Sequence, residues 1–358
     1  MKTQKALGPL AFALAYTLPA LVLLGVQFGG WAYYAVPIFA FGILPVLDQL
    51  FGTHLHNPDA EETRSLLDNK GYTWIAAGFV PVQIALVVGG AYLFAKGNLA
   101  AFEQIGLLLS VGICTGGIGI TLAHEFLHKP RKMERFLSKV LLLFVSYMHF
   151  YIEHLRGHHR RVATPEDPAS ARYGENFYGF YGRTLKGSFT DAWSLERNRL
   201  EKKKISFWHW RNQMLWFTGL PVVLATVLGL TFGWQGAVFF VAQSWLAMTL
   251  LEAVNYVEHY GLARQQIRPG VYEAVAVHHS WNSNHTLTNC LLFMLQRHSD
   301  HHAHQSRDYQ ILRQFDTSPQ LPAGYPTMIL LALVPPLWKT VMHKRLSDYE
   351  VKMNQVTA

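Results

Sequence analysis

Six apolar stretches, each about 20 residues long, dominate this chain of 358 residues. A helix of that length spans the hydrocarbon core of a bilayer. Charged residues make up only 15% of the chain, against roughly 25% in soluble domains. The stretches cover residues 8–27, 31–50, 74–95, 104–124, 214–231 and 234–256. The sequence therefore predicts an all-α integral membrane protein with six transmembrane helices.

Two further apolar stretches, residues 136–151 and 325–342, are interrupted by polar residues or proline. The first carries Lys139, and the second contains Pro335 and Pro336. We expect interfacial or buried helices there rather than additional spans. The stretch 8–27 is followed almost at once by another span and lacks a clear cleavage site, so we interpret it as mature sequence rather than a signal peptide.

Basic residues are distributed unequally between the loops. With six spans, both termini lie on one side, and that side carries every one of the 31 Lys and Arg residues except Lys96. Cytoplasmic loops are enriched in Lys and Arg. We therefore expect both termini on the cytoplasmic side of the membrane. The chain is then one membrane domain, residues 1–358, with a cytoplasmic helical cap formed by residues 124–213 and 258–358.

The formal net charge of +8 is concentrated in residues 124–213, whose basic excess equals that of the whole chain. Two interpretations stay open. The excess reflects membrane topology and contact with anionic lipid head groups, or it forms a docking face for an acidic protein. We expect no nucleic-acid partner.

Cysteine and glycine patterns limit the cofactors. Cys114 and Cys290 have no partner at a metal-binding or redox spacing, which excludes an iron–sulfur cluster and a built-in rubredoxin-type centre. No G-x-G-x-x-G motif follows a strand, and we expect no bound flavin, haem or nicotinamide cofactor.

Four glycines lie within one span: Gly112, Gly116, Gly117 and Gly119. They either allow close helix packing or leave room for a ligand.

Eight histidines lie in three short sets, and a ninth, His259, stands alone. The sets are His124 and His128; His154, His158 and His159; and His298, His301 and His302. Residues three or four apart share one face of a helix, so two imidazoles at that spacing can bind one metal ion. His259 ends the sixth span at the membrane surface where His124 ends the fourth, which makes it a further candidate ligand.

Nine imidazoles exceed what one ion can take and fit two ions with four or five ligands each. Imidazole suits zinc, copper, iron and nickel, so the spacing does not name the metal. Four acidic residues stand beside the candidate ligands: Glu125, Glu153, Glu258 and Asp300. We expect them to accept the second N–H of a ligand imidazole. For the other nine histidines, His209 among them, we expect ordinary polar roles or contacts that support the ligands without binding the metal.

Four sequence blocks around these histidines resemble one known family. The blocks are His-Glu-Phe-Leu-His-Lys at 124–129, Glu-His-Leu-Arg-Gly-His-His at 153–159, Asn-Tyr-Val-Glu-His-Tyr-Gly-Leu at 255–262 and Leu-Gln-Arg-His-Ser-Asp-His-His-Ala at 295–303. The three-set pattern is similar to that of the membrane-bound di-iron desaturases and hydroxylases. Within that group, the blocks resemble the signatures of bacterial alkane 1-monooxygenases, in order and over nearly the whole chain.

This resemblance implies a cofactor, a reaction and a partner. It implies two iron ions held by the nine histidines, and O2-dependent hydroxylation of the terminal methyl group of medium-chain alkanes that arrive through the bilayer. It also implies electrons from rubredoxin, which an NADH-dependent reductase reduces. A hydroxylase of aromatic methyl groups and an acyl desaturase are alternatives with the same chemistry. A membrane metal transporter is the alternative from another class.

Overall fold

The computed structural model describes residues 4–357. In this part of the chain, six helical segments are long and apolar enough to cross a membrane. They are Pro9–Phe28, Gly30–Phe51, Gly71–Lys96, Ala101–Leu127, Gln213–Phe232 and Trp234–His259. Each coincides with one predicted span, so the all-α prediction of a multi-pass membrane protein is confirmed.

Three spans are continuous α-helices and three are assembled from shorter segments. The continuous ones are α6 (Gly71–Lys96), α13 (Gln213–Phe232) and α14 (Trp234–His259). The first span joins α1 (Pro9–Phe12), the 3₁₀ segment η1 (Ala13–Tyr16) and α2 (Thr17–Phe28). The second joins η2 (Gly30–Tyr34), α3 (Ala35–Ile38), η3 (Phe39–Ile43) and α4 (Leu44–Phe51), and the fourth joins α7 (Ala101–Ile113), η4 (Cys114–Gly119) and α8 (Ile120–Leu127). Segments η3 and η4 are π-helical, a form that often marks functional sites.

The remaining elements are mostly short helices. They are α5 (Ala60–Asp68), α9 (Lys132–Leu143), α10 (Phe150–Glu153), η5 (His154–His158), α11 (His159–Arg161), α12 (Phe177–Lys202), α15 (Thr286–Leu291), α16 (His298–Ala303), η6 (Tyr309–Ile311), α17 (Tyr325–Ala332) and α18 (Pro335–Thr357). The stretch 325–342 is divided before Pro335, whose ring suits the first turn of a helix but not its interior. A small antiparallel hairpin of β1 (Gln266–Arg268) and β2 (Val271–Tyr272) was not expected from the sequence.

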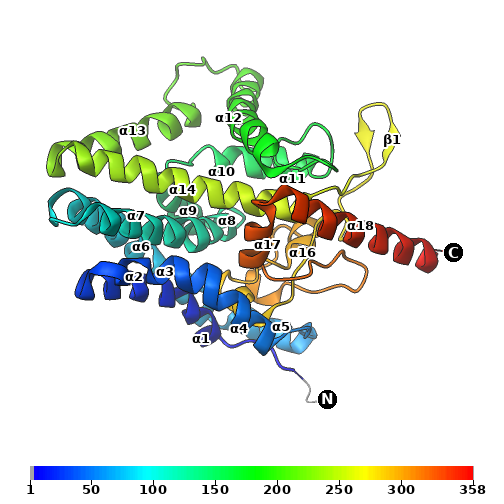
Figure 1. The fold of residues 1–358 in the computed structure, drawn as a ribbon. Coiled ribbons are helices and arrows are strands. Elements are labelled where there is room, and N and C mark those ends of the chain that lie inside the picture. Colours follow the sequence, from blue (N-terminus) through cyan, green and yellow to red (C-terminus); the bar gives the residue numbers. More distant parts are fainter. Residues whose placement is uncertain (1–3, 358) are drawn as a thin grey trace.

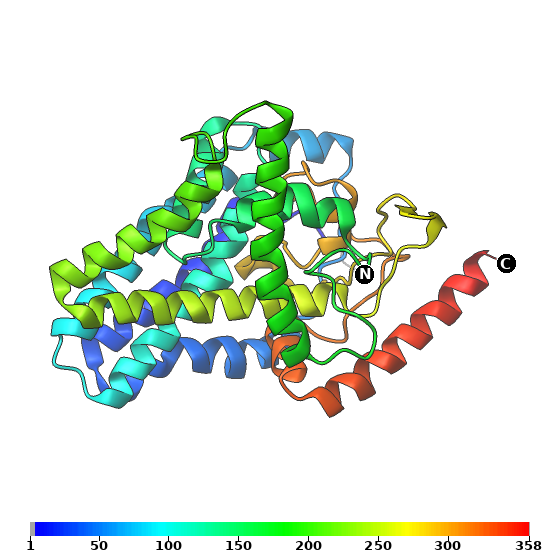
Figure 2. The ribbon, with the colours of Figure 1, turned by 90° about the horizontal axis from the view of Figure 1, so that it is seen from above.

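The spans form a bundle, and the other elements gather at one end of it, together with both described ends of the chain (Figure 1). Helix α14 runs through the middle of the molecule (Figure 2) and contacts α6, α7, α12, α13 and α17. It therefore connects the bundle to the cap, and its last residue, His259, is fully buried between them.

The glycines of the fourth span serve both of the roles considered for them. A Cβ on Gly116 would lie 2.7 Å from the Cα of Ala247, and one on Gly112 would lie 2.7 Å from the Leu246 side chain. These glycines let the fourth span pack closely against α14. Gly117 instead faces open space, with no heavy atom within 4 Å of a Cβ there, and lines a cavity.

Candidate metal centre

All nine candidate histidines come together in two neighbouring groups. In each group the ligand atoms lie within 4.8 Å of one another. The first, cluster A, consists of His124, His128, His154, His159 and His301, and the second, cluster B, of His158, His259, His298 and His302. The rings of His159 and His302, one from each cluster, have centroids 4.5 Å apart. The structure therefore offers two adjacent sites, with five and four imidazoles.

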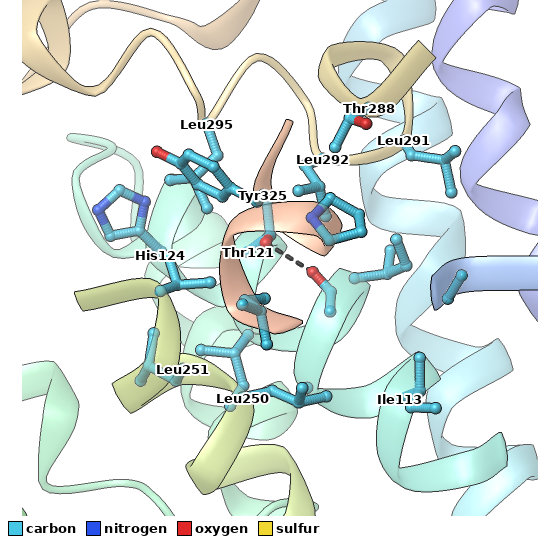
Figure 3. Close-up of a pocket in the computed structure, with 18 of the residues that line it drawn as sticks. Ile113, Thr121, His124, Leu250, Leu251, Thr288, Leu291, Leu292, Leu295 and Tyr325 are labelled. Atoms are coloured by element: carbon cyan, nitrogen blue, oxygen red, sulfur yellow. Dashed lines mark hydrogen bonds between the residues drawn. The ribbon is translucent and has the colours of Figure 1, made fainter. Parts of the chain in front are cut away.

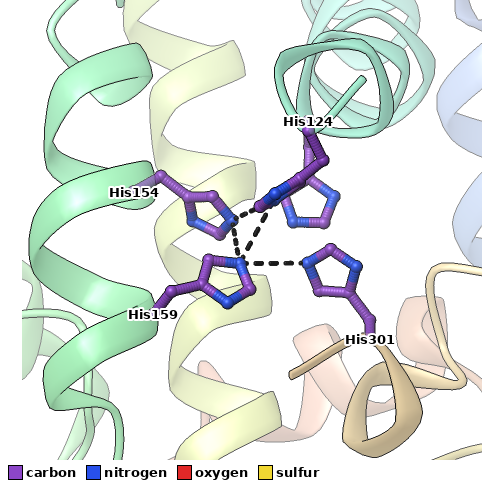
Figure 4. A group of neighbouring side chains, drawn as sticks. His124, His154, His159 and His301 are labelled. Carbon is purple, nitrogen blue, oxygen red and sulfur yellow. Dashed lines mark hydrogen bonds between the residues drawn. The ribbon is translucent and has the colours of Figure 1, made fainter. Parts of the chain in front are cut away.

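Cluster A is formed where α8, η5, α11 and α16 meet (Figure 4). The Nε2 atom of His159 lies 2.9 Å from that of His154, 3.1 Å from that of His128 and 3.1 Å from that of His301. The Nε2 atom of His124 is buried and has no hydrogen-bond partner among the described residues. All five rings thus direct a nitrogen toward one small volume.

Cluster B takes its residues from η5, α14 and α16. The Nε2 atom of His298 lies 2.9 Å from that of His302 and 3.3 Å from that of His259, and the Nε2 atoms of His302 and His158 lie 3.2 Å apart. His259 was a lone histidine in the sequence. Its place at the end of α14 puts it in the cluster.

The second histidine set is divided between the clusters because its backbone is π-helical. Segment η5 runs from His154 to His158, and π-helical hydrogen bonds join residues five apart. His154 and His159 therefore point into cluster A, while His158 points into cluster B. In the α-helix that the sequence suggested, His154 and His158 would share a face. The other sets keep their i,i+4 pairs, His124 with His128 and His298 with His302.

The nitrogen atoms fit two cations. Their Nε2–Nε2 distances lie between 2.9 and 3.3 Å, and a neutral imidazole has only one N–H, so several lone pairs converge on each site. Burial, reinforced by the surrounding imidazoles, holds the pKa of His154, His159 and His302 well below the ordinary value. Neutral imidazole is the form that binds metals, and each cluster can accordingly hold one ion.

The four carboxylates expected beside the ligands have different contacts. Glu258 Oε2 lies 3.1 Å from Nε2 of His298, the nitrogen that faces cluster B rather than the outer one. Glu125 pairs with Lys129 and accepts the backbone N–H of Tyr309 at 3.2 Å.

The other two carboxylates are both buried. Asp300 pairs with Arg307 and accepts the N–H of Arg313 at 2.8 Å. Glu153 has Arg161 at 4.0 Å, and its Oε1 has no hydrogen-bond partner among the described residues. Among the described residues, Glu125, Asp300 and Glu153 thus face Lys, Arg or backbone N–H groups, and not the imidazoles expected from the sequence.

Asp167 supplies the outer contact that sequence reasoning assigned to other acids. Its Oδ2 lies 2.9 Å from Nδ1 of His158 and accepts the Ser170 hydroxyl at 2.6 Å. An Nδ1–H donated to Asp167 leaves Nε2 of His158 free for a metal. One sequence feature could have indicated this contact. Asp167 lies between Pro165 and Pro168, eight residues after His159, the last histidine of the second set.

An apolar cavity of about 90 Å³ leads from the bundle to both clusters. Its walls include Leu18, Leu44, Ile113, Gly117 and Leu251, and its inner end is formed by His124 and His154 of cluster A and His298 of cluster B. Figure 3 shows His124 and Tyr325 among the leucines. Tyr325, which the sequence did not single out, donates its hydroxyl to Glu258 Oε1 at 2.7 Å. The cavity suits a slender apolar molecule whose end lies beside the two histidine clusters.

Comparisons with known proteins agree with this geometry. Residues 102–332 match the model of the fatty acid desaturase family. The chain is 44% identical to alkane 1-monooxygenase 2 of Pseudomonas aeruginosa over 321 residues, which are 89% of this chain and 85% of the relative. It is 42% identical to alkane 1-monooxygenase 2 of Alcanivorax borkumensis over 356 residues, 98% of this chain and 93% of the relative.

A more distant relative carries a different name. The xylene/toluene monooxygenase hydroxylase component of Pseudomonas putida is 27% identical over 277 residues, which are 75% of this chain and 73% of the relative. The higher identity and the longer coverage both lie with the alkane enzymes. The chain belongs to the alkane 1-monooxygenases, within the fatty acid desaturase family.

Proposed function

We propose that this protein hydroxylates the terminal methyl group of medium-chain n-alkanes to 1-alkanols, with O2 as the oxidant. One alkane, one O2, two electrons and two protons give one alcohol and one water, so a C–H bond and the O–O bond break while C–O and O–H bonds form. The observation that carries the proposal is the apolar cavity that ends at both histidine clusters. The relatives that bear the name alkane 1-monooxygenase support it.

We further propose that the metals are two iron ions, one in each cluster, with the nine histidines as their ligands. Iron would supply redox activation of O2, which this reaction needs because a primary C–H bond has no acidic proton for a base to remove. The family and the all-imidazole donor sets support iron, although imidazole also suits other metals. The residues of the chain hold the ions, orient His158 through Asp167 and exclude water with apolar walls.

Reduced rubredoxin is the proposed electron donor, itself reduced by an NADH-dependent reductase. A surface hollow of about 490 Å³ is lined by four arginines and one acid, Arg156, Arg160, Arg161, Arg264 and Glu166. Arg156 pairs with Glu196 and Arg161 with Asp191, whereas Arg160 is exposed. Arg160 and Arg161 follow directly after His159 of cluster A, so a donor in this hollow would sit close to the metals. Positive charge at this place favours a donor with an acidic face and speeds its encounter.

The proposed location is the bacterial inner membrane, with the cap and both termini on the cytoplasmic side. The clusters lie in the end of the bundle where the cap gathers. The Lys and Arg residues outside Lys96 all belong to loops assigned to that side, in line with the positive-inside rule. Rubredoxin and NADH would then reach the enzyme from the cytoplasm.

The test is product formation by the purified protein in lipid nanodiscs, supplied with rubredoxin, its reductase, NADH and O2. We expect 1-octanol from octane and 1-dodecanol from dodecane. The absence of any 1-alkanol would overturn the proposal. The relative named for xylene and toluene makes aromatic methyl hydroxylation the second candidate, and methylbenzyl alcohol from xylene without alkanol would favour it. A desaturated acyl product would instead identify the protein as an acyl desaturase, the third candidate.

A further inference from the structure

We propose that Glu273, His278 and His279 form a third metal site, separate from clusters A and B, for a zinc-like divalent cation. One carboxylate oxygen and one ring nitrogen from each histidine lie within 4.8 Å of one another. The site follows strand β2, at the base of the hairpin that projects from the cap (Figure 1). It goes beyond the proposed hydroxylation, which does not require it.

Local hydrogen bonds hold two of the three side chains in position. Nδ1 of His279 accepts the backbone N–H of Ala276 at 2.9 Å, which leaves Nε2 directed toward Glu273 Oε1 at 3.2 Å. Glu273 Oε1 also accepts the N–H of Gln265 at 2.7 Å. Arg264 donates to the backbone carbonyl of Glu273 rather than to its carboxylate. The carboxylate is thus fixed but not neutralised by the guanidinium.

His278 completes the donor set. Its ring centroid lies 4.1 Å from that of His279. His279 is buried, while His278 and Glu273 are partly exposed, so a cation can enter from solvent. Two imidazoles and one carboxylate are the protein ligands of open zinc sites, in which water takes the fourth position. For Nε2 to bind the cation as a neutral imidazole, the ring proton of His279 moves to Nδ1 and the hydrogen bond from Ala276 opens.

A cation here would also stiffen a segment that contacts cluster B. The backbone of His279 is hydrogen-bonded to the imidazole of His259, and Ser280 Oγ lies 3.4 Å from His259 Nδ1. One residue of the third site, His279, and its neighbour Ser280 therefore contact His259 of cluster B directly. A cation in the third site would hold the hairpin base and these groups together.

The experiment titrates the iron-loaded protein with Co²⁺, and measures bound cobalt and iron together with the visible absorption of cobalt. We expect about one cobalt per chain with iron retained, and bands of low-coordinate Co²⁺ with nitrogen ligands. His278→Ala and Glu273→Gln should each weaken cobalt binding by about tenfold or more. Glu273→Gln keeps an acceptor for His279, and retained iron shows that each variant is folded. His209→Ala, in the loop before α13, is the matched control and should bind cobalt as the unmodified chain does.

Three results would overturn the proposal. The first is that the iron-loaded protein binds no cobalt in addition to its iron. The second is cobalt gained only as iron is lost, which would place it in clusters A and B. The third is unchanged cobalt affinity in both His278→Ala and Glu273→Gln.

Discussion

Glu258 Oε2 lies 3.1 Å from the Nε2 atom of His298, on the side of that imidazole that faces the other histidines of cluster B. The same carboxylate accepts the Tyr325 hydroxyl and lines the apolar cavity. It therefore lies between the apolar cavity and cluster B. This position differs from that of an outer carboxylate, such as Asp167, which contacts Nδ1 of His158.

Replacing Glu258 by Gln should weaken metal binding in cluster B. The amide keeps the size of the side chain and an acceptor for Tyr325, but it removes the negative charge beside His298. We expect a loss of about 10–100-fold in affinity for one of the two ions, measured by chelator competition and by Mössbauer spectroscopy of the protein loaded with ⁵⁷Fe. Tyr325→Phe keeps the carboxylate and should retain both ions. Identical spectra for Glu258→Gln and the unmodified protein would contradict this role.

Asp167→Asn tests the outer contact to His158. The substitution removes the charge that holds Nδ1–H of His158, and we expect metal affinity to fall by about 10–100-fold. Glu153→Gln is the matched control, because Glu153 is buried next to His154 and faces Arg161, with no hydrogen-bond partner for its Oε1 among the described residues. Iron retention during dialysis against a chelator provides the measurement. Equal iron loss in both variants would show that the contact between Asp167 and the His158 imidazole does not determine the metal affinity.

Gly117→Leu should shift the substrate preference toward shorter alkanes. Gly117 lines the cavity and has open space where a Cβ would stand, so the new side chain fills room that a long alkane needs. We expect the ratio of dodecane to octane turnover to fall by about tenfold, measured by gas chromatography of the alcohols.

Gly112→Ala is the contrasting variant, since Gly112 does not line the cavity and its Cβ would lie 2.7 Å from the side chain of Leu246. It should cost about 1–3 kcal/mol of stability through overpacking and leave the chain-length preference of the folded fraction unchanged. The reverse result, a chain-length preference that changes only in Gly112→Ala, would exclude this account of the cavity.

Arg160→Glu should weaken electron delivery without affecting the metals. Arg160 is exposed at the arginine-lined hollow, and reversing its charge should raise the KM for rubredoxin by about tenfold at low salt while iron content stays the same. The effect should shrink at high ionic strength, because salt screens exposed charges. Lys203→Glu reverses an exposed charge at the end of α12, away from the hollow. A similar rise in KM for both variants would point to net charge rather than to a docking surface.

The spans and the histidines could be predicted because their signals are local. Apolar length identifies a membrane helix, and i,i+4 spacing identifies the pairs His124–His128 and His298–His302. The assignment of His154, His158 and His159 to separate clusters could not be predicted, because it depends on a π-helical turn whose hydrogen bonds are decided by packing. Asp167 was missed for a similar reason. Its loop folds back onto His158, whereas Glu153, adjacent to a ligand in sequence, faces Arg161 instead.

The two histidine clusters are proposed to hold two irons that hydroxylate alkanes. Iron content and 1-octanol formation should be measured on the same samples of the unmodified protein, His301→Ala, His302→Ala and His209→Ala. His301 and His302 are adjacent in sequence but belong to clusters A and B. We predict about two irons per chain and 1-octanol for the unmodified protein and for His209→Ala, and loss of iron and of product for both cluster variants. Undiminished 1-octanol from a variant that has lost its iron would contradict the account.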